Sequence, residues 1–167
     1  MKKLTVLALA IVLFAACSSN EQPVRYASSS PEIDALKSSI EQYLAQNWDE
    51  YRKHYADTAK FRNNVPKGKE ITLDSVISNW KQENEMFSDI HYVADEDFFE
   101  MVVTDDGETW VNFWGLWSAV LNANGQKFEL PVHVTVRFED GKIVAEHGYW
   151  NSSEITLALR DLETGGE

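Results

Sequence analysis

Residues 126–150 read QKFELPVHVTVRFEDGKIVAEHGYW, and this stretch decides the expected fold. Apolar and polar residues alternate through its first half, as they do in a strand with one buried face. The apolar face consists of Phe128, Leu130, Val132, Val134, Val136 and Phe138. The opposite face consists of Glu129, His133, Thr135 and Arg137. A hairpin turn at 139–141 (EDG) separates two predicted strands, at 126–138 and 142–150.

Two more hairpin turns precede this stretch, at 105–107 (DDG) and 122–125 (NANG). They delimit strand-like segments near 90–104 and 108–121. The second half of the chain therefore predicts an antiparallel meander of four strands.

Before residue 88 the apolar residues follow a helical period instead. Ile33, Leu36, Ile40 and Leu44 predict a first helix, which Pro31 opens at its first turn. Thr72 is the expected N-cap of a later helix that runs to about residue 87.

The segment between these two helices predicts a second helix that begins near Asn47. Trp48, Tyr51 and Tyr55 form its apolar stripe, and a short extended piece follows around Phe61. A closing helix is expected after residue 151. Helices that precede hairpin-linked strands indicate an α+β fold, with helices covering one face of a curved sheet.

Two blocks of the sequence resemble a known superfamily. Residues 47–61 (NWDEYRKHYADTAKF) resemble the first block of the nuclear transport factor 2-like superfamily and its SnoaL-like branch, and residues 140–144 (DGKIV) with 149–151 (YWN) resemble its last block. The resemblance covers about residues 32–160. It implies a cone-shaped α+β barrel with a deep apolar pocket and, often, a dimer formed through the sheet. Members of the superfamily include isomerases, dehydratases and cyclases as well as non-catalytic binding domains.

The N-terminus predicts a secretion signal with a lipidation site. Lys2 and Lys3 precede an apolar run at 4–14, which is too short to span a bilayer. Residues 14–17 (FAAC) resemble a bacterial lipobox, which implies cleavage after residue 16 and lipid attachment to Cys17, the only cysteine.

This interpretation divides the chain into four parts. Residues 1–16 are the expected lipoprotein signal, 17–30 the lipidated cysteine and a flexible tether, 31–163 the folded domain and 164–167 a tail. Ser18 after the cysteine is similar to the pattern of lipoproteins sent to the outer membrane, so we expect an envelope protein anchored there by its lipid.

The net charge of the 167-residue chain is −12, which disfavours nucleic acid as a partner. His54, His91, His133 and His147 show no short ligand spacing, so the sequence predicts no metal site. No cofactor-binding motif is present either, and we expect no cofactor.

Candidate catalytic residues are few. In the isomerases of the superfamily the base lies just after the short strand, where this chain has Asn63 and Asn64, and an amide cannot remove a proton. His147 and Asp57 are the remaining weak candidates. His147 shares an alternating face with Ile143, so we expect it to point into the cone as a base, a ligand-orienting group or a hydrogen-bonded inner histidine; Asp57 also fits a capping role.

Aromatic residues give a more definite expectation. Rings from several predicted elements would surround a cavity, and with one histidine they give the expected ligand-binding set: Tyr51, Tyr55, Trp80, Trp114, His147 and Tyr149. Trp117 or Trp150 would then lie on the outer face of the sheet.

Three functions remain open from the sequence. The first is a lipoprotein domain that binds a small apolar ligand or a protein partner without recognisable catalysis. The second is a SnoaL-like enzyme that acts on a hydrophobic carbonyl compound as an isomerase, dehydratase or cyclase. The third is an assembly module that forms a homodimer through its outer sheet face. A titratable group inside the cavity, with a hydrogen-bond partner, would favour the enzyme.

Overall fold

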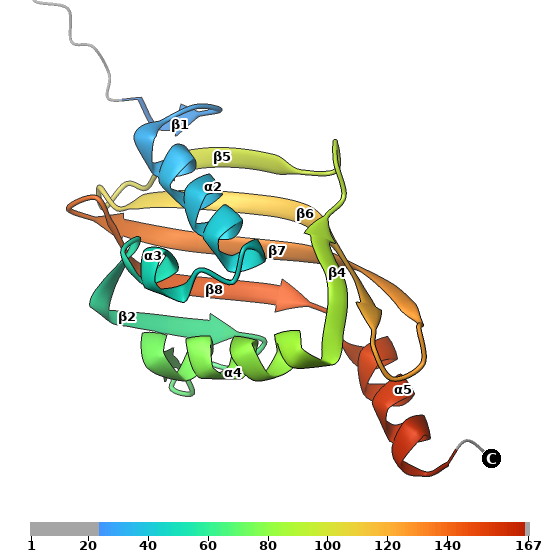
Figure 1. Ribbon diagram of the computed structural model, residues 1–167. Coiled ribbons are helices and arrows are strands. Elements are labelled where there is room, and N and C mark those ends of the chain that lie inside the picture. The colour runs from blue at the N-terminus through green and yellow to red at the C-terminus, as the bar shows by residue number, and fades with distance from the viewer. Residues whose placement is uncertain (1–23, 166–167) are drawn as a thin grey trace, which may run out of the picture.

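The computed structural model describes residues 24–165, and the predicted signal and Cys17 lie outside these residues. Its elements follow in chain order: β1 (Tyr26–Ala27), α2 (Pro31–Leu44), α3 (Trp48–Arg52), β2 (Tyr55–Asn63), β3 (Ile71–Thr72), α4 (Leu73–Met86), β4 (Phe87–Tyr92), β5 (Phe98–Val103), β6 (Thr109–Leu121), β7 (Lys127–Glu139), β8 (Lys142–Trp150) and α5 (Ser153–Glu163). One curved sheet of eight strands contains all the strands of this part of the chain (Figure 1). The expected α+β fold with a bent sheet is confirmed.

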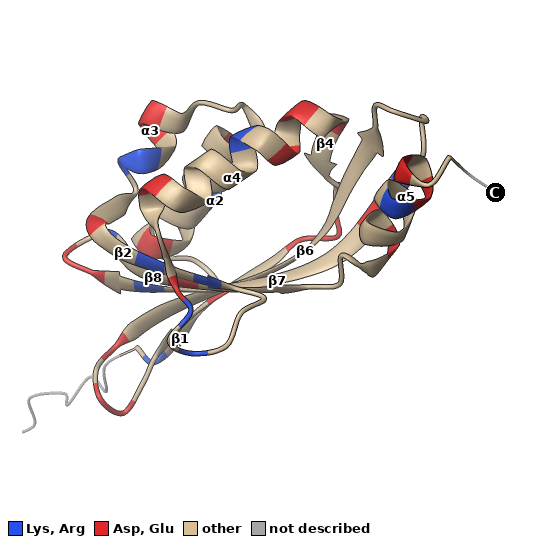
Figure 2. Cartoon of the chain, turned by 90° about the horizontal axis from the view of Figure 1, so that it is seen from below, with Lys and Arg blue, Asp and Glu red and all other residues tan. Residues whose placement is uncertain are grey.

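The sheet has the order β1-β5-β6-β7-β8-β2-β3, and β4 adds to β6 outside this path. All pairings are antiparallel except that of β2 with β8. Helices α2, α3 and α4 lie over one face of the sheet, and α5 lies at one end of it (Figure 2). We call the face that points toward these helices the inner face and the opposite one the outer face.

The two long helices begin where Pro31 and Thr72 predict. Ser30 accepts a hydrogen bond from the backbone N–H of Ile33 at 3.2 Å, directly before Pro31. Thr72 accepts one from the N–H of Ser75 at 3.3 Å and starts α4. Both helices turn their apolar stripes, including Leu36 and Val76, into the core against the sheet.

The predicted single strand at 90–104 is wrong, because two strands occupy this segment. Both pair with β6, β5 along its first half and β4 along its second half, since β6 is long enough to serve both. Helix α4 runs into β4 without a connecting residue, because Phe87 is at once its C-cap and the first residue of the strand.

The predicted second helix is also shorter than expected. It ends at Arg52, and Tyr55 begins β2, where it pairs with Ile143 of β8. Pairing with a neighbouring strand therefore overrides the helical spacing of Tyr55. Similarly, Tyr26 and Ala27 belong to the sheet through β5, although they lie in the segment expected to be a tether.

A β-bulge in β8 determines which residues face the helices. Arg137 pairs with Ala145, but Phe138 pairs with Ile143, so Val144 is an extra residue on one strand. The alternation of β8 therefore shifts by one position after Ile143.

No helix among the described residues is long and apolar enough to cross a membrane.

Candidate functional site

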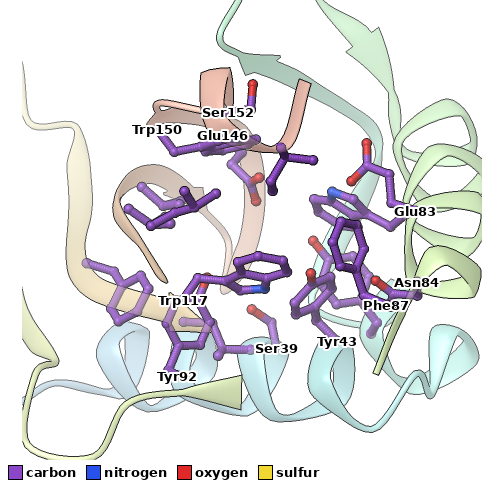
Figure 3. A pocket seen from close by; sticks show the side chains of 18 of the residues that line it. Ser39, Tyr43, Glu83, Asn84, Phe87, Tyr92, Trp117, Glu146, Trp150 and Ser152 are labelled. Atoms are coloured by element: carbon purple, nitrogen blue, oxygen red, sulfur yellow. The ribbon is translucent and has the colours of Figure 1, made fainter. Parts of the chain in front are cut away.

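A pocket lies between the inner face of the sheet and the helices that cover it. Its cavity volume is about 310 Å³. Side chains from α2, α4, the strands and α5 converge on it (Figure 3). Its polar lining residues include Ser39, Tyr43, Glu83, Asn84 and Glu146, and most of the remaining lining is apolar or aromatic.

Glu146 of β8 is the central polar group of this pocket. Its side chain is only 5% exposed, and both carboxyl oxygens accept hydrogen bonds. The hydroxyl of Tyr55 donates to Oε2 at 2.8 Å, and the amide nitrogen of Asn63 donates to Oε1 at 2.9 Å. The hydroxyl of Tyr51 donates in turn to the hydroxyl of Tyr55 at 2.6 Å. The chain thus builds a connected polar network inside an apolar cavity.

Burial controls the protonation of this network. Loss of hydration raises the pKa of Glu146 above its usual range, against the opposing effect of the hydrogen bonds from Asn63 and Tyr55. Burial also raises the pKa of Tyr51 and of Tyr55, so both hydroxyls keep their protons and act as donors. The pKa of Tyr43 rises to about 12 for the same reason. The pocket therefore holds a buried carboxyl whose proton is retained to higher pH than usual, beside several hydroxyls that stay protonated.

Gly148 allows the polar network to form. A side chain at this position would collide with the Trp150 ring and would lie 2.7 Å from the Asn63 amide oxygen. Because Gly148 leaves this space open, Asn63 reaches Glu146 and Trp150 folds over the strand into the pocket.

Aromatic rings form much of the remaining wall. The lining contains Tyr43, Tyr51, Tyr55, Trp80, Phe87, Tyr92, Phe113, Trp117 and Trp150. Several meet nearly edge to face: Tyr51 and Trp80 at 87° with centroids 5.4 Å apart, and Phe87 and Trp117 at 82° with centroids 5.7 Å apart. Neighbouring rings therefore present faces that point in different directions.

Comparison with known proteins assigns this fold and pocket to a family. The SnoaL-like domain matches residues 36–146, which are most of the described chain. The chain belongs to the SnoaL-like domain family. A search of curated proteins finds no match.

Solved structures share the architecture of this SnoaL-like domain at low sequence identity. An NTF2-like protein of unknown function from Burkholderia pseudomallei is 16% identical with a TM-score of 0.59, over 77% of this chain and 97% of that one. IdmH, a putative polyketide cyclase from Streptomyces antibioticus, is 16% identical with a TM-score of 0.61, over 78% and 99%. A putative isomerase from Bacillus subtilis is 15% identical with a TM-score of 0.58, over 82% and 94%. These likenesses show the NTF2-like fold and leave the chemistry open.

The SnoaL-like domain brings together only half of the residues that the sequence singled out for a pocket. Tyr51, Tyr55 and Trp80 line it. Trp114 and Tyr149 do not, because their alternation places them on the outer face, where they are 38% and 48% exposed.

The expectation that His147 points into the cone is wrong. The bulge at Val144 turns His147 to the outer face and Glu146 to the inner one. There the Arg62 guanidinium donates to His147 Nδ1 at 3.0 Å, and burial together with this cation lowers the pKa of His147. Asp57, the other catalytic candidate, is exposed on β2 and lies outside the lining.

Trp117 and Trp150 lie on the inner face, where Trp114 and Tyr149 were expected. The outer face was expected to carry Trp117 or Trp150, but both line the pocket. For β6 a signal was present in the sequence, since Asn112 and Ser118 share the face of Trp114, whereas Val111 shares the more apolar face of Trp117. For Glu146 no such signal existed, because the bulge is visible only in the pairing of β7 with β8.

Within residues 24–165 no group of three or more His, Cys, Asp or Glu side chains is arranged to hold a metal ion.

Proposed function

We propose that this SnoaL-like domain binds a small, largely apolar molecule in the pocket, with the carboxyl of Glu146 as its polar anchor. The observation that carries the proposal is a buried carboxyl that lines a cavity of about 310 Å³. Ligand pockets in proteins are of this size and combine apolar walls with a few placed polar groups.

Two substitutions on neighbouring residues of β7 test this binding. Val134 lines the pocket, so Val134→Phe fills part of the cavity. Thr135 points to the outer face, so Thr135→Phe adds a ring where no pocket exists. The neutral fluorescent probe N-phenyl-1-naphthylamine should bind the natural chain and Thr135→Phe equally well and Val134→Phe at least about tenfold more weakly. Equal binding by all three proteins would contradict the pocket proposal.

A second candidate function is proton transfer, and the network of Tyr51, Tyr55 and Glu146 favours it. A carboxyl with a raised pKa in an apolar site is suited to remove a proton from the carbon beside a carbonyl group and to return it elsewhere on the same molecule. Tyr43 and Asn84 supply polar groups in the same pocket for the oxygen that gains charge.

Deuterium exchange tests this second function directly. 2-Tetralone in D₂O should exchange its α-protons faster with the natural chain than without it, as followed by NMR. Glu146→Gln should lower the protein-dependent rate by about 10²–10⁴-fold. Glu85→Gln, an exposed change outside the lining, should leave it unchanged. An absence of protein-dependent exchange would contradict proton transfer on this class of compound.

The outer face supports the proposal of a homodimer. Phe98, Trp114, His133 and Tyr149 form one row of rings across four strands. Their centroids are 5.5, 4.6 and 6.2 Å apart along the row, and three of the rings are well exposed. Exposed apolar patches of this kind mark interaction sites. Light scattering over a range of concentrations should show a dimer that Trp114→Glu dissociates, and a strict monomer would reject it.

The place of the domain in the cell remains a proposal that rests on the N-terminal sequence. A lipid on Cys17 would hold the domain at the cell envelope, at the outer membrane if Ser18 acts as a sorting residue. In a detergent phase partition the natural protein should enter the detergent phase and Cys17→Ser the aqueous phase. Partition of both proteins into the same phase would reject lipid anchoring through Cys17.

A further inference from the structure

The charged groups of the pocket are all acidic. Glu146 from β8 and Glu83 from α4 line it from different walls (Figure 3). Among the described residues of the lining there is no Lys, Arg or His. Partial loss of hydration raises the pKa of Glu83 as well, although its side chain reaches solvent at the rim. The site therefore lacks a cation of its own to balance either carboxyl.

The basic residues of the sheet lie on the other side. Lys60, Arg62, Arg137, His133 and His147 belong to outer-face positions, where each pairs across the strands with other outward-facing residues. The sheet therefore does carry basic side chains, but those named here lie on its outer face and not in the pocket.

The ring walls of the pocket also suit a positive charge. The face of an aromatic ring carries partial negative charge and attracts cations, and tryptophan does so most strongly. Tyr43 meets Trp80 at 67° with centroids 5.3 Å apart, and Tyr92 meets Phe113 at 87° with centroids 5.0 Å apart. Rings set at such angles present faces in different directions along the pocket wall, as the rings of aromatic cages for ammonium groups do.

We propose that the ligand of this pocket is a hydrophobic organic cation, that is, an amine or a quaternary ammonium group on an apolar body; this inference rests on the binding function proposed above. The cationic group lies among the rings near Glu146, and the apolar body extends along Leu130, Val132 and Ile155. The cation supplies the opposite charge that the buried carboxyl otherwise lacks. An anionic ligand would meet two carboxyls and the negative faces of the rings.

Matched probes of equal shape test the charge of the ligand. Phenyltrimethylammonium and tert-butylbenzene differ by one nitrogen in place of a carbon, and benzenesulfonate carries the opposite charge. Calorimetric titration uses residues 17–167 with Cys17→Ser, which removes the predicted lipid site and leaves the described residues unchanged. The ammonium compound should bind at least about tenfold more tightly than the neutral compound, and the sulfonate should not bind.

Three variants sharpen this test. Glu146→Gln keeps the size of the side chain and should remove most of the preference for the cation while leaving binding of tert-butylbenzene nearly unchanged. Glu83→Gln should lower the preference partly. Because Glu83 is exposed, this variant should fold normally even if Glu146→Gln does not. Glu85→Gln, on the same helix but outside the lining, should leave the preference as it is.

The outcomes separate the two proposals. Equal affinity for the charged and neutral compounds would overturn the inference about charge and leave the pocket function standing. Binding of N-phenyl-1-naphthylamine without binding of phenyltrimethylammonium would do the same. If neither of these compounds nor tert-butylbenzene binds, the proposed function falls together with the inference.

Discussion

The inner and outer faces of the sheet are both rich in rings, yet they differ in enclosure and in charge. The inner face surrounds a cavity, buries Glu146 and has no basic side chain in the pocket lining of the described chain. The outer face carries the exposed ring row, and Arg62, Arg137 and His147 lie on the same face. The comparison teaches that ring content alone does not identify a pocket. The pocket face is identified instead by its enclosed cavity and by the absence of basic side chains from the described lining.

The largest difference between the faces should appear in stability. Phe113 is 1% exposed on the inner face, and Phe98 is 48% exposed on the outer face. Phe113→Ala leaves a cavity in the core and should lower the free energy of unfolding by about 3–5 kcal/mol. Phe98→Ala should lower it by less than about 1 kcal/mol. Urea unfolding measures both, and similar losses would mean that the outer face is buried in an assembly.

A smaller effect is expected from substitutions on the two sides of β8. Gly148→Ala places a methyl group against the Trp150 ring and the Asn63 side chain, so it should cost about 1–3 kcal/mol and weaken probe binding in the pocket. Ala145→Val adds more volume on the outward side of the same strand. It should change stability by less than about 0.5 kcal/mol. A stable Gly148→Ala variant with unchanged binding would show that Asn63 and Trp150 can move aside.

The buried carboxyl should make stability depend on pH. The pKa of Glu146 in the folded protein lies above its ordinary value, so between these two pH values the folded state holds a proton that the unfolded state has released. Stability should therefore fall as pH rises through this window and level off above the raised pKa. Each unit of the difference corresponds to about 1.4 kcal/mol.

Glu146→Gln should remove this part of the pH dependence, whereas Glu85→Gln, at an exposed position, should retain it. Thermal unfolding from pH 4 upward, in steps of about one unit, measures the slope. An identical slope in both variants would contradict a raised pKa at Glu146.

The smallest effect concerns the outer face alone. Burial and the neighbouring Arg62 guanidinium lower the pKa of His147. Arg62→Ala should raise that pKa toward the ordinary value and change stability by less than about 1 kcal/mol. Arg137→Ala, which removes another cation of this face, should leave it nearly unchanged. NMR titration of the His147 ring protons measures both, and an unshifted pKa in Arg62→Ala would assign the effect to burial alone.

The sequence predicted the parts of this fold that depend on local pattern. Pro31 opens α2 and Thr72 caps α4 as expected, and the expected alternation in β7 is present. The boundary at Tyr55 was wrong because a helical spacing and a strand pairing competed for the same residue, and the partner strand lies far along the chain.

The site was harder to predict than the fold. A single extra residue in β8 exchanges Glu146 with His147, and no short-range signal marks it. In β6 the choice between Trp114 and Trp117 could have been made from the polar neighbours Asn112 and Ser118. The residues that line the pocket thus followed from strand register, which sequence periodicity alone does not determine.

The parallel pairing of β2 with β8 has a consequence for how the protein is made. The partners of Glu146 in β2 lie 91 and 83 residues earlier, at Tyr55 and Asn63. During synthesis β2 leaves the ribosome long before β8 is made. Tyr55 and Asn63 therefore have no Glu146 carboxyl to donate to until β8 is present. Because contacts so distant in sequence form late, the interior of this domain is completed only after β8 has emerged.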